Sequence, residues 1–304
     1  MSKKTKAIIY WSVIGILIAV VLFSVGTIIH KMVSDTQNEQ QYQDLASNKN
    51  QLAGTRPPIP TGPHTTVPTT APTTQPTKPS APQPSTTPDT TTTPTTSTTP
   101  TTIPLASDER RILQEYKDAY RINNDMVGWI QIPGTTVDYP VVQSKYEKDF
   151  YLRRNFYKQN AVCGAIYARE ACSIDPASDN VVLYGHNMNN GTMFQNLLNY
   201  KKKNYWQSHR YVYFDTLTEY RTYEIFAVFV TSADRDEGFR YHTFNNASSP
   251  EAFDEFVAKC KELSYYDTGI TPEYGDKLVT LSTCDRTVGY GADGRLVVVA
   301  RRVV

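Results

Sequence analysis

From residue 126 onward, apolar residues come in short runs rich in Val, Ile, Tyr and Phe, separated by residues typical of turns. Runs of this length and composition predict β-strands, and Pro133-Gly134 and Asp175-Pro176 mark two of the breaks between them. About eight such strands within one stretch of chain predict a mainly antiparallel β-barrel or sandwich. The predicted strands are GWIQI, YPVVQ, CGAIYA, NVVLYGH, RYVYF, TYEIFAVFVT, DKLVTLST and RLVVVARRV.

Two segments of the same region show helical spacing of their apolar residues instead. Residues 108–124 predict a helix that Ser107 or Asp108 would cap, and a second helix follows Ser249 with Pro250 at its first position. A shorter helical piece is predicted within residues 190–203. The two apolar faces comprise Ile112, Tyr116, Ala119 and Tyr120 in the first helix, and Phe253, Phe256, Val257 and Cys260 in the second.

The longest apolar run lies near the N-terminus, from Ala7 to Ile29, and contains no charged residue. About 20 helical residues cross the hydrocarbon core of a bilayer, so this run is long enough to span it. Lysines precede the run and acidic residues follow it, which predicts that residues 1–6 are cytoplasmic and the chain after residue 30 is outside. A cleavable signal peptide is the alternative, but its apolar region would be only about 7–15 residues long.

Composition separates a further segment, residues 55–104, which contains 21 Thr and 14 Pro among 50 positions. Such a tract buries too little apolar surface to offset its ordering entropy, and its prolines favour an extended, semi-rigid spacer. The chain therefore divides into an anchor at 7–29, a juxtamembrane segment at 30–54, this Thr/Pro tract, and a folded domain at 105–304. A net charge of +1 without a basic cluster argues against a nucleic-acid partner.

The four cysteines differ in their surroundings. In an exported chain, Cys163 and Cys172 either form a disulfide or remain buried thiols, and Cys260 belongs to the core face of a helix. No Cys/His cluster has the spacing of zinc ligands. Cys284 stands at the end of a predicted strand beside a loop, where a thiol adds little to a core. This position is suited to a nucleophile.

A cysteine nucleophile needs a base or a cation as its partner, because the thiolate is the reactive form. Among the histidines, His186 is favoured because it ends the run NVVLYGH at the edge between a strand and a loop. His30 borders the membrane and His64 lies in the Thr/Pro tract. His209 and His242 have polar neighbours, which is typical of surface histidines.

Acyl transfer also requires a group that stabilises the oxyanion of the tetrahedral intermediate. Arg295 opens the strand that follows Cys284. If the two strands pair as neighbours across the loop DRTVGYGADG, their facing ends place Arg295 beside Cys284. Arg286 in the loop, and Arg301 and Arg302 near the C-terminus, are the alternatives, for which a solvated surface charge is the ordinary interpretation.

The motif TLSTC, followed by an arginine at a strand start and preceded by YGH, resembles the sortases, the membrane-anchored cysteine transpeptidases of Gram-positive bacteria. The resemblance extends over residues 107–304. The segments DMVGWIQIPGTTVDYPVVQ, DFYLRRNFY and LYGHNMNNGTMF resemble class B in particular. The resemblance implies a mainly β fold, a sortase-like eight-stranded β-barrel with an N-terminal helix and one or two inserted helices. The Thr/Pro tract is longer than the linker expected of this family.

The resemblance also implies roles for individual residues. Cys284 would be the nucleophile, His186 the general acid and base, and Arg295 the oxyanion or substrate-binding residue, while Ser282 and Thr283 would line the substrate groove. The implied enzyme cleaves a C-terminal sorting signal, NPxTN-like or xPxTG-like, of an exported protein after its Thr. It then transfers the acyl group from a cysteine thioester to an amine of lipid II or the cell-wall cross-bridge. No metal or organic cofactor is implied.

Two alternatives stay open at this point. A sortase that polymerises pilins would have the same three residues but use a protein lysine as the acceptor. A non-enzymatic adhesin, presented on a mucin-like tract, would explain the anchor and the tract but would leave Cys284, His186 and Arg295 without a role.

Overall fold

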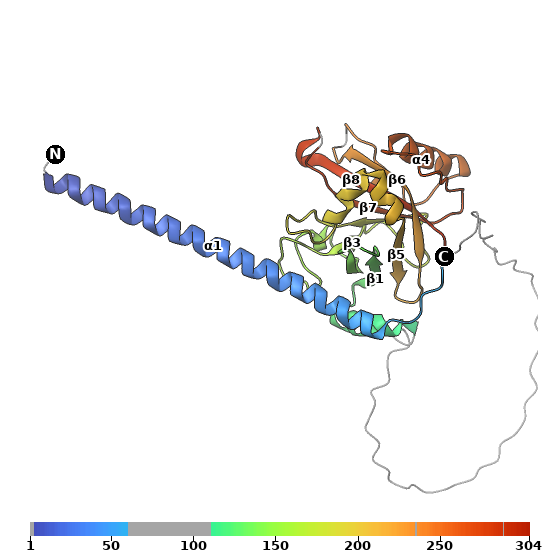
Figure 1. The fold of residues 1–304 in the computed structure, drawn as a ribbon, viewed down its shortest axis with the longest axis horizontal. Coiled ribbons are helices and arrows are strands. Elements are labelled where there is room, and N and C mark those ends of the chain that lie inside the picture. Colours follow the sequence, from blue (N-terminus) through green and yellow to red (C-terminus); the bar gives the residue numbers. More distant parts are fainter. Residues whose placement is uncertain (1–2, 60–110, 235, 288) are drawn as a thin grey trace, which may run out of the picture. The chain divides into compact units, whose positions relative to one another are not determined.

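A computed structural model describes residues 3–59, 111–234, 236–287 and 289–304 (Figure 1). In this part of the chain eight strands close into one barrel with the order β1-β2-β3-β4-β7-β8-β6-β5. The strands are β1 (Met126–Gln131), β2 (Asp138–Val142), β3 (Ile166–Ala168), β4 (Asn180–Tyr184), β5 (Tyr211–Thr216), β6 (Thr222–Ser232), β7 (Leu278–Cys284) and β8 (Gly294–Arg302).

The helices lie before and between these strands. The long ones are α1 (Lys3–Leu52) and α4 (Pro250–Leu263). The shorter ones are η2 (Gln114–Tyr116), α2 (Lys117–Ile122), η3 (Phe150–Leu152), η4 (Gln195–Lys201), α3 (Lys203–Ser208), η5 (Tyr241–Thr243) and η6 (Gly291–Asp293).

The sheet is mixed, although most of its strand pairs are antiparallel. Two pairs are parallel, namely β2 with β3 and β4 with β7, and both need long crossover connections. The predicted β-barrel with a preceding helix and inserted helices is therefore confirmed, and the sandwich is excluded by the closed strand order. The β4–β7 pair matters most for function, because it brings distant parts of the sequence to the same end of the barrel.

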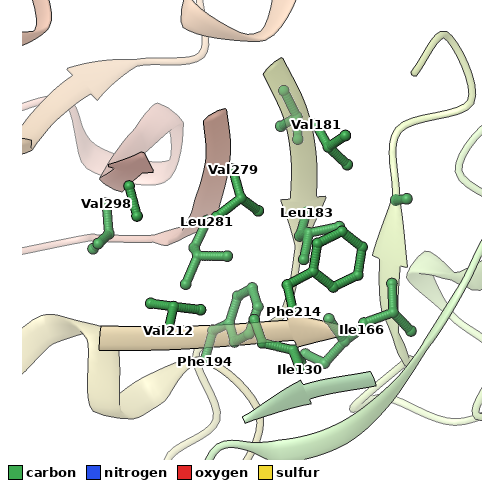
Figure 2. Close-up of a cluster of buried hydrophobic side chains, with 14 of the residues drawn as sticks. Ile130, Ile166, Val181, Leu183, Phe194, Val212, Phe214, Val279, Leu281 and Val298 are labelled. Atoms are coloured by element: carbon green, nitrogen blue, oxygen red, sulfur yellow. The ribbon is translucent and has the colours of Figure 1, made fainter. Parts of the chain in front are cut away.

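The core fills the inside of the barrel with side chains from strands on all sides, as Figure 2 shows. Every labelled residue there is at most 1% exposed. Nine of these residues lie on strands, where successive side chains point to opposite faces and every second one enters the barrel, whereas Phe194 enters from the start of η4. The labelled residues are Ile130, Ile166, Val181, Leu183, Phe194, Val212, Phe214, Val279, Leu281 and Val298.

Helix α4 agrees with the sequence-based prediction. The Ser249 Oγ accepts a hydrogen bond from the Ala252 N–H at 3.3 Å, Pro250 is the first helical residue, and the helix packs against β6. Its predicted apolar face, Phe253, Phe256, Val257 and Cys260, is buried. The N-cap side chain binds a free backbone N–H group of the first turn, and proline is well suited to the first helical position. Both features are local in sequence, so this helix could be predicted.

The helix predicted over residues 108–124 is shorter in the structure. It consists of η2 and α2 and ends at Ile122, because Asn123 is extended and its amide donates to the Tyr151 hydroxyl and the Phe156 carbonyl. The two predicted caps, Ser107 and Asp108, lie outside the described residues. The predicted apolar face is confirmed for Ile112, Tyr116 and Ala119, which are buried, and Tyr120 is half-buried.

Helix α1 continues well past the apolar run, to Leu52, and its C-terminal part packs on the barrel. Asn38, Tyr42, Leu45 and Lys49 are each at most 8% exposed and recur at helical spacing along one face. The Lys49 Nζ lies 2.6 Å from the Asp138 Oδ1. The sequence-based division left residues 30–54 outside the folded domain, because this face mixes polar with apolar residues and so hides the amphipathic pattern.

The first residues of the Thr/Pro tract and the helical segment beyond it contact the same side chain of the barrel. Arg56 at its start and Tyr116 beyond its end both bind the buried carboxylate of Asp215, with Arg56 Nη1 2.8 Å from Oδ1 and the Tyr116 hydroxyl 2.6 Å from Oδ2. The Arg56 guanidinium also lies 4.0 Å from the centre of the Tyr213 ring. The tract therefore joins two segments that both pack on the barrel. The predicted lack of structure concerns residues 55–104, of which residues 60–104 lie outside the described residues.

Candidate active site

The end of β7 carries Cys284, and the start of the neighbouring β8 carries Arg295. The two strands are antiparallel, and in their register Cys284 is paired with Arg295. The connecting loop and η6 return the chain directly to the strand beside it, and the Asp285 N–H donates to the Gly294 carbonyl at 2.9 Å. The expected pairing of the two strands, with Arg295 beside Cys284, is therefore present.

The third predicted residue, His186, reaches the same end of the barrel by the parallel pairing of β4 with β7. Tyr184 is the register partner of Ser282, so His186, two residues further along the chain, lies at the level of Cys284. The Asn187 side chain, next in the chain, donates to the Cys284 carbonyl at 3.0 Å. The ends of two adjacent parallel strands thus bring an imidazole and a thiol together from positions almost a hundred residues apart.

One open cavity of about 540 Å³ is lined by all five of the predicted residues, Ser282, Thr283, Cys284, His186 and Arg295. Ser282 and Thr283 are buried in its wall, and the Ser282 Oγ lies 2.7 Å from the Tyr241 hydroxyl. His242, for which the sequence suggested an ordinary surface position, also contributes to the wall. It belongs to η5, outside the strand register that relates His186 to Cys284.

Cys284 differs from the other three cysteines in exposure. Cys163, Cys172 and Cys260 are free thiols at most 7% exposed, whereas Cys284 is partly exposed at the cavity. Burial raises the pKa of Cys163 to about 11 and that of Cys260 further, so these thiols stay protonated and unreactive at neutral pH. In the structure Cys163 and Cys172 are free thiols that form no disulfide, and Cys284 is the partly exposed thiol that lines the cavity.

The imidazole of His186 is held by a backbone carbonyl. Its Nε2 lies 2.7 Å from the Leu152 oxygen. A carbonyl oxygen only accepts hydrogen bonds, so Nε2 carries the proton and Nδ1 is the nitrogen left for proton transfer. Burial lowers the pKa of His186, and the positive charges of Arg153, Arg286 and Arg295 lower it further, against the raising effect of the Leu152 hydrogen bond. The neutral ring is therefore favoured near neutral pH.

The guanidinium of Arg295 is oriented by its own loop. Its Nη1 donates to the carbonyls of Ala292 at 3.0 Å and Gly294 at 2.9 Å, which holds the positive charge at the cavity wall. The alternatives Arg301 and Arg302 lie at the opposite end of β8, where Arg301 pairs in register with Leu278. Arg286 is exposed in the loop. Arg295 is thus the arginine of this set that lines the cavity.

An ion pair between a buried carboxylate and a partly exposed lysine fixes the residue that follows Cys284. The Asp285 side chain is inaccessible to solvent, and its Oδ2 lies 2.5 Å from the Lys201 Nζ of η4. Its Oδ1 accepts from the Thr287 N–H at 3.0 Å and from the Thr287 hydroxyl at 2.6 Å. Sequence reasoning missed this support, as it missed Leu152, Asn187 and Tyr241, because each of them acts through a tertiary contact that no local pattern signals.

Comparisons of the sequence with protein-family models and with known proteins point to the same family. A model of the sortase domain matches residues 130–303. Sortase B of Listeria monocytogenes is 34% identical to the chain over 193 residues, which cover 63% of this chain and 75% of that protein.

Solved structures agree with this result. The crystal structure of sortase B from Bacillus anthracis in complex with AAEK1 is 35% identical, with a TM-score of 0.55, and the match covers 63% of this chain and 85% of that one. A Staphylococcus aureus sortase B–substrate complex, 20% identical, matches the fold with a TM-score of 0.63 over 89% of this chain and 98% of that one. The relatives named above are class B sortase transpeptidases, and the chain therefore belongs to the sortase family.

Proposed function

We propose that Cys284, His186 and Arg295 carry out the transpeptidation, with Cys284 as the nucleophile. The observation that carries this proposal is their common cavity, in which Cys284 is paired in register with Arg295 and lies level with His186. Of the four cysteines, Cys284 is partly exposed, whereas the other three are buried.

In the first step, Nδ1 of His186 takes the proton of the Cys284 thiol, and the resulting thiolate attacks the carbonyl carbon of the Thr in a sorting signal. The carbonyl oxygen becomes an oxyanion, and the amide C–N bond breaks as the intermediate collapses to a thioester on Cys284. The leaving amine takes a proton from His186. We assign this proton to Nδ1, because Nε2 is engaged by the Leu152 carbonyl.

In the second step, an incoming amine attacks the thioester carbon. His186 removes a proton from this amine through Nδ1, the C–S bond breaks, and a new amide bond forms while Cys284 returns as the thiolate. The lowered pKa of His186 keeps its neutral form, the proton acceptor of this step, available near neutral pH.

Arg295 would stabilise the oxyanion in both steps. A fixed positive charge contributes most where charge develops in a partly desolvated cavity, because it needs no reorganisation at the moment of reaction. The two carbonyl contacts of its Nη1 leave the other guanidinium nitrogens for the substrate. Ser282 and Thr283 would form the wall against which the signal peptide lies.

The proposed substrates are the C-terminal sorting signal of an exported protein, NPxTN-like or xPxTG-like, and an amine of the cell-wall precursor. Support comes from two solved structures of relatives, the Staphylococcus aureus sortase B–substrate complex and a sortase B complexed with triglycine. The substrate and the triglycine bound by these relatives correspond to the two reactants of such a transfer.

We further propose that α1 anchors the enzyme in the cell membrane, with residues 1–6 in the cytoplasm and the barrel facing the cell wall. Among the described helices, α1 is the one long and apolar enough to span a bilayer. Because the same helix packs on the barrel at Tyr42 and Lys49, its length sets the distance between barrel and membrane. About 20 Å of helix separates Ile29 from Tyr42, at 1.5 Å per residue.

Substitution of Cys284 tests the proposed function, with Cys172 as the matched control. Cys284→Ala should abolish both cleavage of a sorting-signal peptide and transfer to an amine, while thermal stability stays close to that of the wild type. Cys172→Ala should keep its turnover, because this thiol is buried away from the cavity lining. Turnover of Cys284→Ala at the wild-type rate would refute the assignment.

A further inference from the structure

Helix α1 makes a buried contact with the barrel that anchoring does not require, in addition to the Lys49–Asp138 ion pair and the hydrogen bond from the Asn155 amide to the Asn38 Oδ1. The hydroxyl of Tyr42 is buried, and it accepts a hydrogen bond from the Phe156 N–H at 3.0 Å while it donates to the Gly164 carbonyl at 2.9 Å. Both partners belong to the segment between η3 and β3, residues 153–165, which we call the η3–β3 loop. A single hydroxyl from α1 thus ties together two distant points of this loop.

The same loop and the η3 residue before it hold the imidazole of His186. The Leu152 carbonyl accepts from Nε2 at 2.7 Å, and the Ala165 N–H closes the loop by donating to the Tyr151 carbonyl at 3.1 Å. Gly164 has a φ of +58°, and a Cβ there would lie 2.7 Å from the Leu152 oxygen and 3.2 Å from the His186 Cδ2. The backbone at Gly164 therefore lies directly against both the imidazole and the carbonyl that orients it.

We propose that Tyr42 is a positioning residue for His186, so that the membrane-distal part of α1 belongs to the catalytic apparatus. The inference rests on the proposed role of His186. It extends that role to a residue outside the region that matches the sortase domain, which begins at residue 130. The contact runs from the Tyr42 hydroxyl to the Gly164 carbonyl, and from the Gly164 backbone to the ring and to Leu152.

The physical reason is that the Tyr42 hydroxyl is the strong partner of both backbone groups. Without it, the buried Phe156 N–H would lose its hydrogen bond, and the Gly164 carbonyl would keep only the weak contact of the Cys163 thiol at 3.5 Å. Poorly satisfied buried groups favour a shift of the loop until they find partners.

Such a shift would affect the rate more than binding. A displacement of about 1 Å in a group that positions a catalytic residue is enough to lower the rate about a hundredfold. Peptide binding at the wall formed by Ser282 would be unaffected, so the turnover number should fall while KM stays nearly constant.

The test is Tyr42→Phe in the full chain, in detergent, with Tyr116→Phe as the matched control. Tyr116 is equally buried, and its hydroxyl also makes a tertiary hydrogen bond, to Asp215, which is remote from the cavity lining. The turnover number and KM are both measured. The turnover number is normalised to the concentration of folded enzyme, which is taken from urea titration. The imidazole N–H signal of His186 is followed by NMR.

Tyr42→Phe should lose about tenfold to a hundredfold in turnover number with KM within about twofold, and the His186 Nε2–H signal should shift or broaden. Tyr116→Phe should keep both the rate and the signal. Wild-type turnover in Tyr42→Phe, alongside an inactive His186→Ala, would overturn the positioning role and leave the proposed function standing. An active His186→Ala would instead refute the proposed function, and the positioning role with it.

Discussion

Arg56 gives the sharpest test of how the fold joins the Thr/Pro tract to the barrel. By composition this residue belongs to a tract predicted to be unfolded, where replacement by alanine would have no effect on stability. In the structure its guanidinium binds both oxygens of Asp215, whose side chain is 2% exposed. Arg56→Ala therefore removes the cation that compensates a buried carboxylate.

The expected loss follows from the burial of the pair. Removing one partner of a fully buried pair costs about 3–5 kcal/mol. Here the Arg56 side chain is 21% exposed, and Asp215 keeps bonds from the Tyr116 hydroxyl and the Arg221 N–H. We therefore expect a loss of about 2–3 kcal/mol, which lowers Tm by about 4–12 °C in a domain of this size.

The assay is thermal and urea unfolding of the full chain in detergent, with Lys259→Ala as the control. Lys259 pairs with Glu262 at 2.8 Å on the exposed side of α4, and an exposed pair of this kind contributes about 0.3–0.5 kcal/mol. A double-mutant cycle with Asp215→Asn isolates the coupling between the two side chains. Equal stability of Arg56→Ala and Lys259→Ala, or a coupling near zero, would show that Arg56 does not bind Asp215.

Three further predictions concern the site and the tract. Because burial and, to a smaller extent, nearby arginines lower the pKa of His186, its ring should titrate below the usual 6.5 by NMR, and Arg286→Ala should raise that pKa; an unchanged pKa in Arg286→Ala would contradict the electrostatic account. Arg295→Ala should reduce kcat/KM about 10²–10³-fold, and Arg295→Lys should retain more activity than Arg295→Ala but less than the wild type. Wild-type kcat/KM in Arg295→Lys would argue against a role for the planar guanidinium. Replacing residues 61–110 by a short Gly/Ser linker should preserve Tm and peptide turnover, since the contacts on both sides remain; a large loss of either would assign a folded role to the tract.

The pairing of Cys284 with Arg295 could be predicted because the two residues flank one short loop between consecutive strands. Such strands pair antiparallel by default, and the register then follows from the loop. His186 was found by a weaker signal, its place at a strand end. The sequence contains no sign that β4 and β7 are parallel neighbours, since that pairing depends on how the whole barrel closes.

The supports of the site could not be predicted, because they act through single tertiary contacts. Leu152 contributes only a backbone carbonyl, which no side-chain pattern reveals. Tyr42 lies on a helical face that also contains Asn38 and Lys49, so its hydrophobic periodicity is weak. Arg56 is one charged residue in a tract of threonine and proline, and composition averages over the specific contact that it makes.

The central claim, that Cys284 forms the acyl-enzyme, is tested most directly by mass spectrometry. The wild-type enzyme is incubated with a sorting-signal peptide in the absence of an amine acceptor, digested, and searched for a thioester-linked acyl group. The account predicts an adduct on Cys284 that disappears when an amine is added, as the second step consumes the thioester. An adduct on Cys163, Cys172 or Cys260, or amide transfer without any thioester on Cys284, would contradict it.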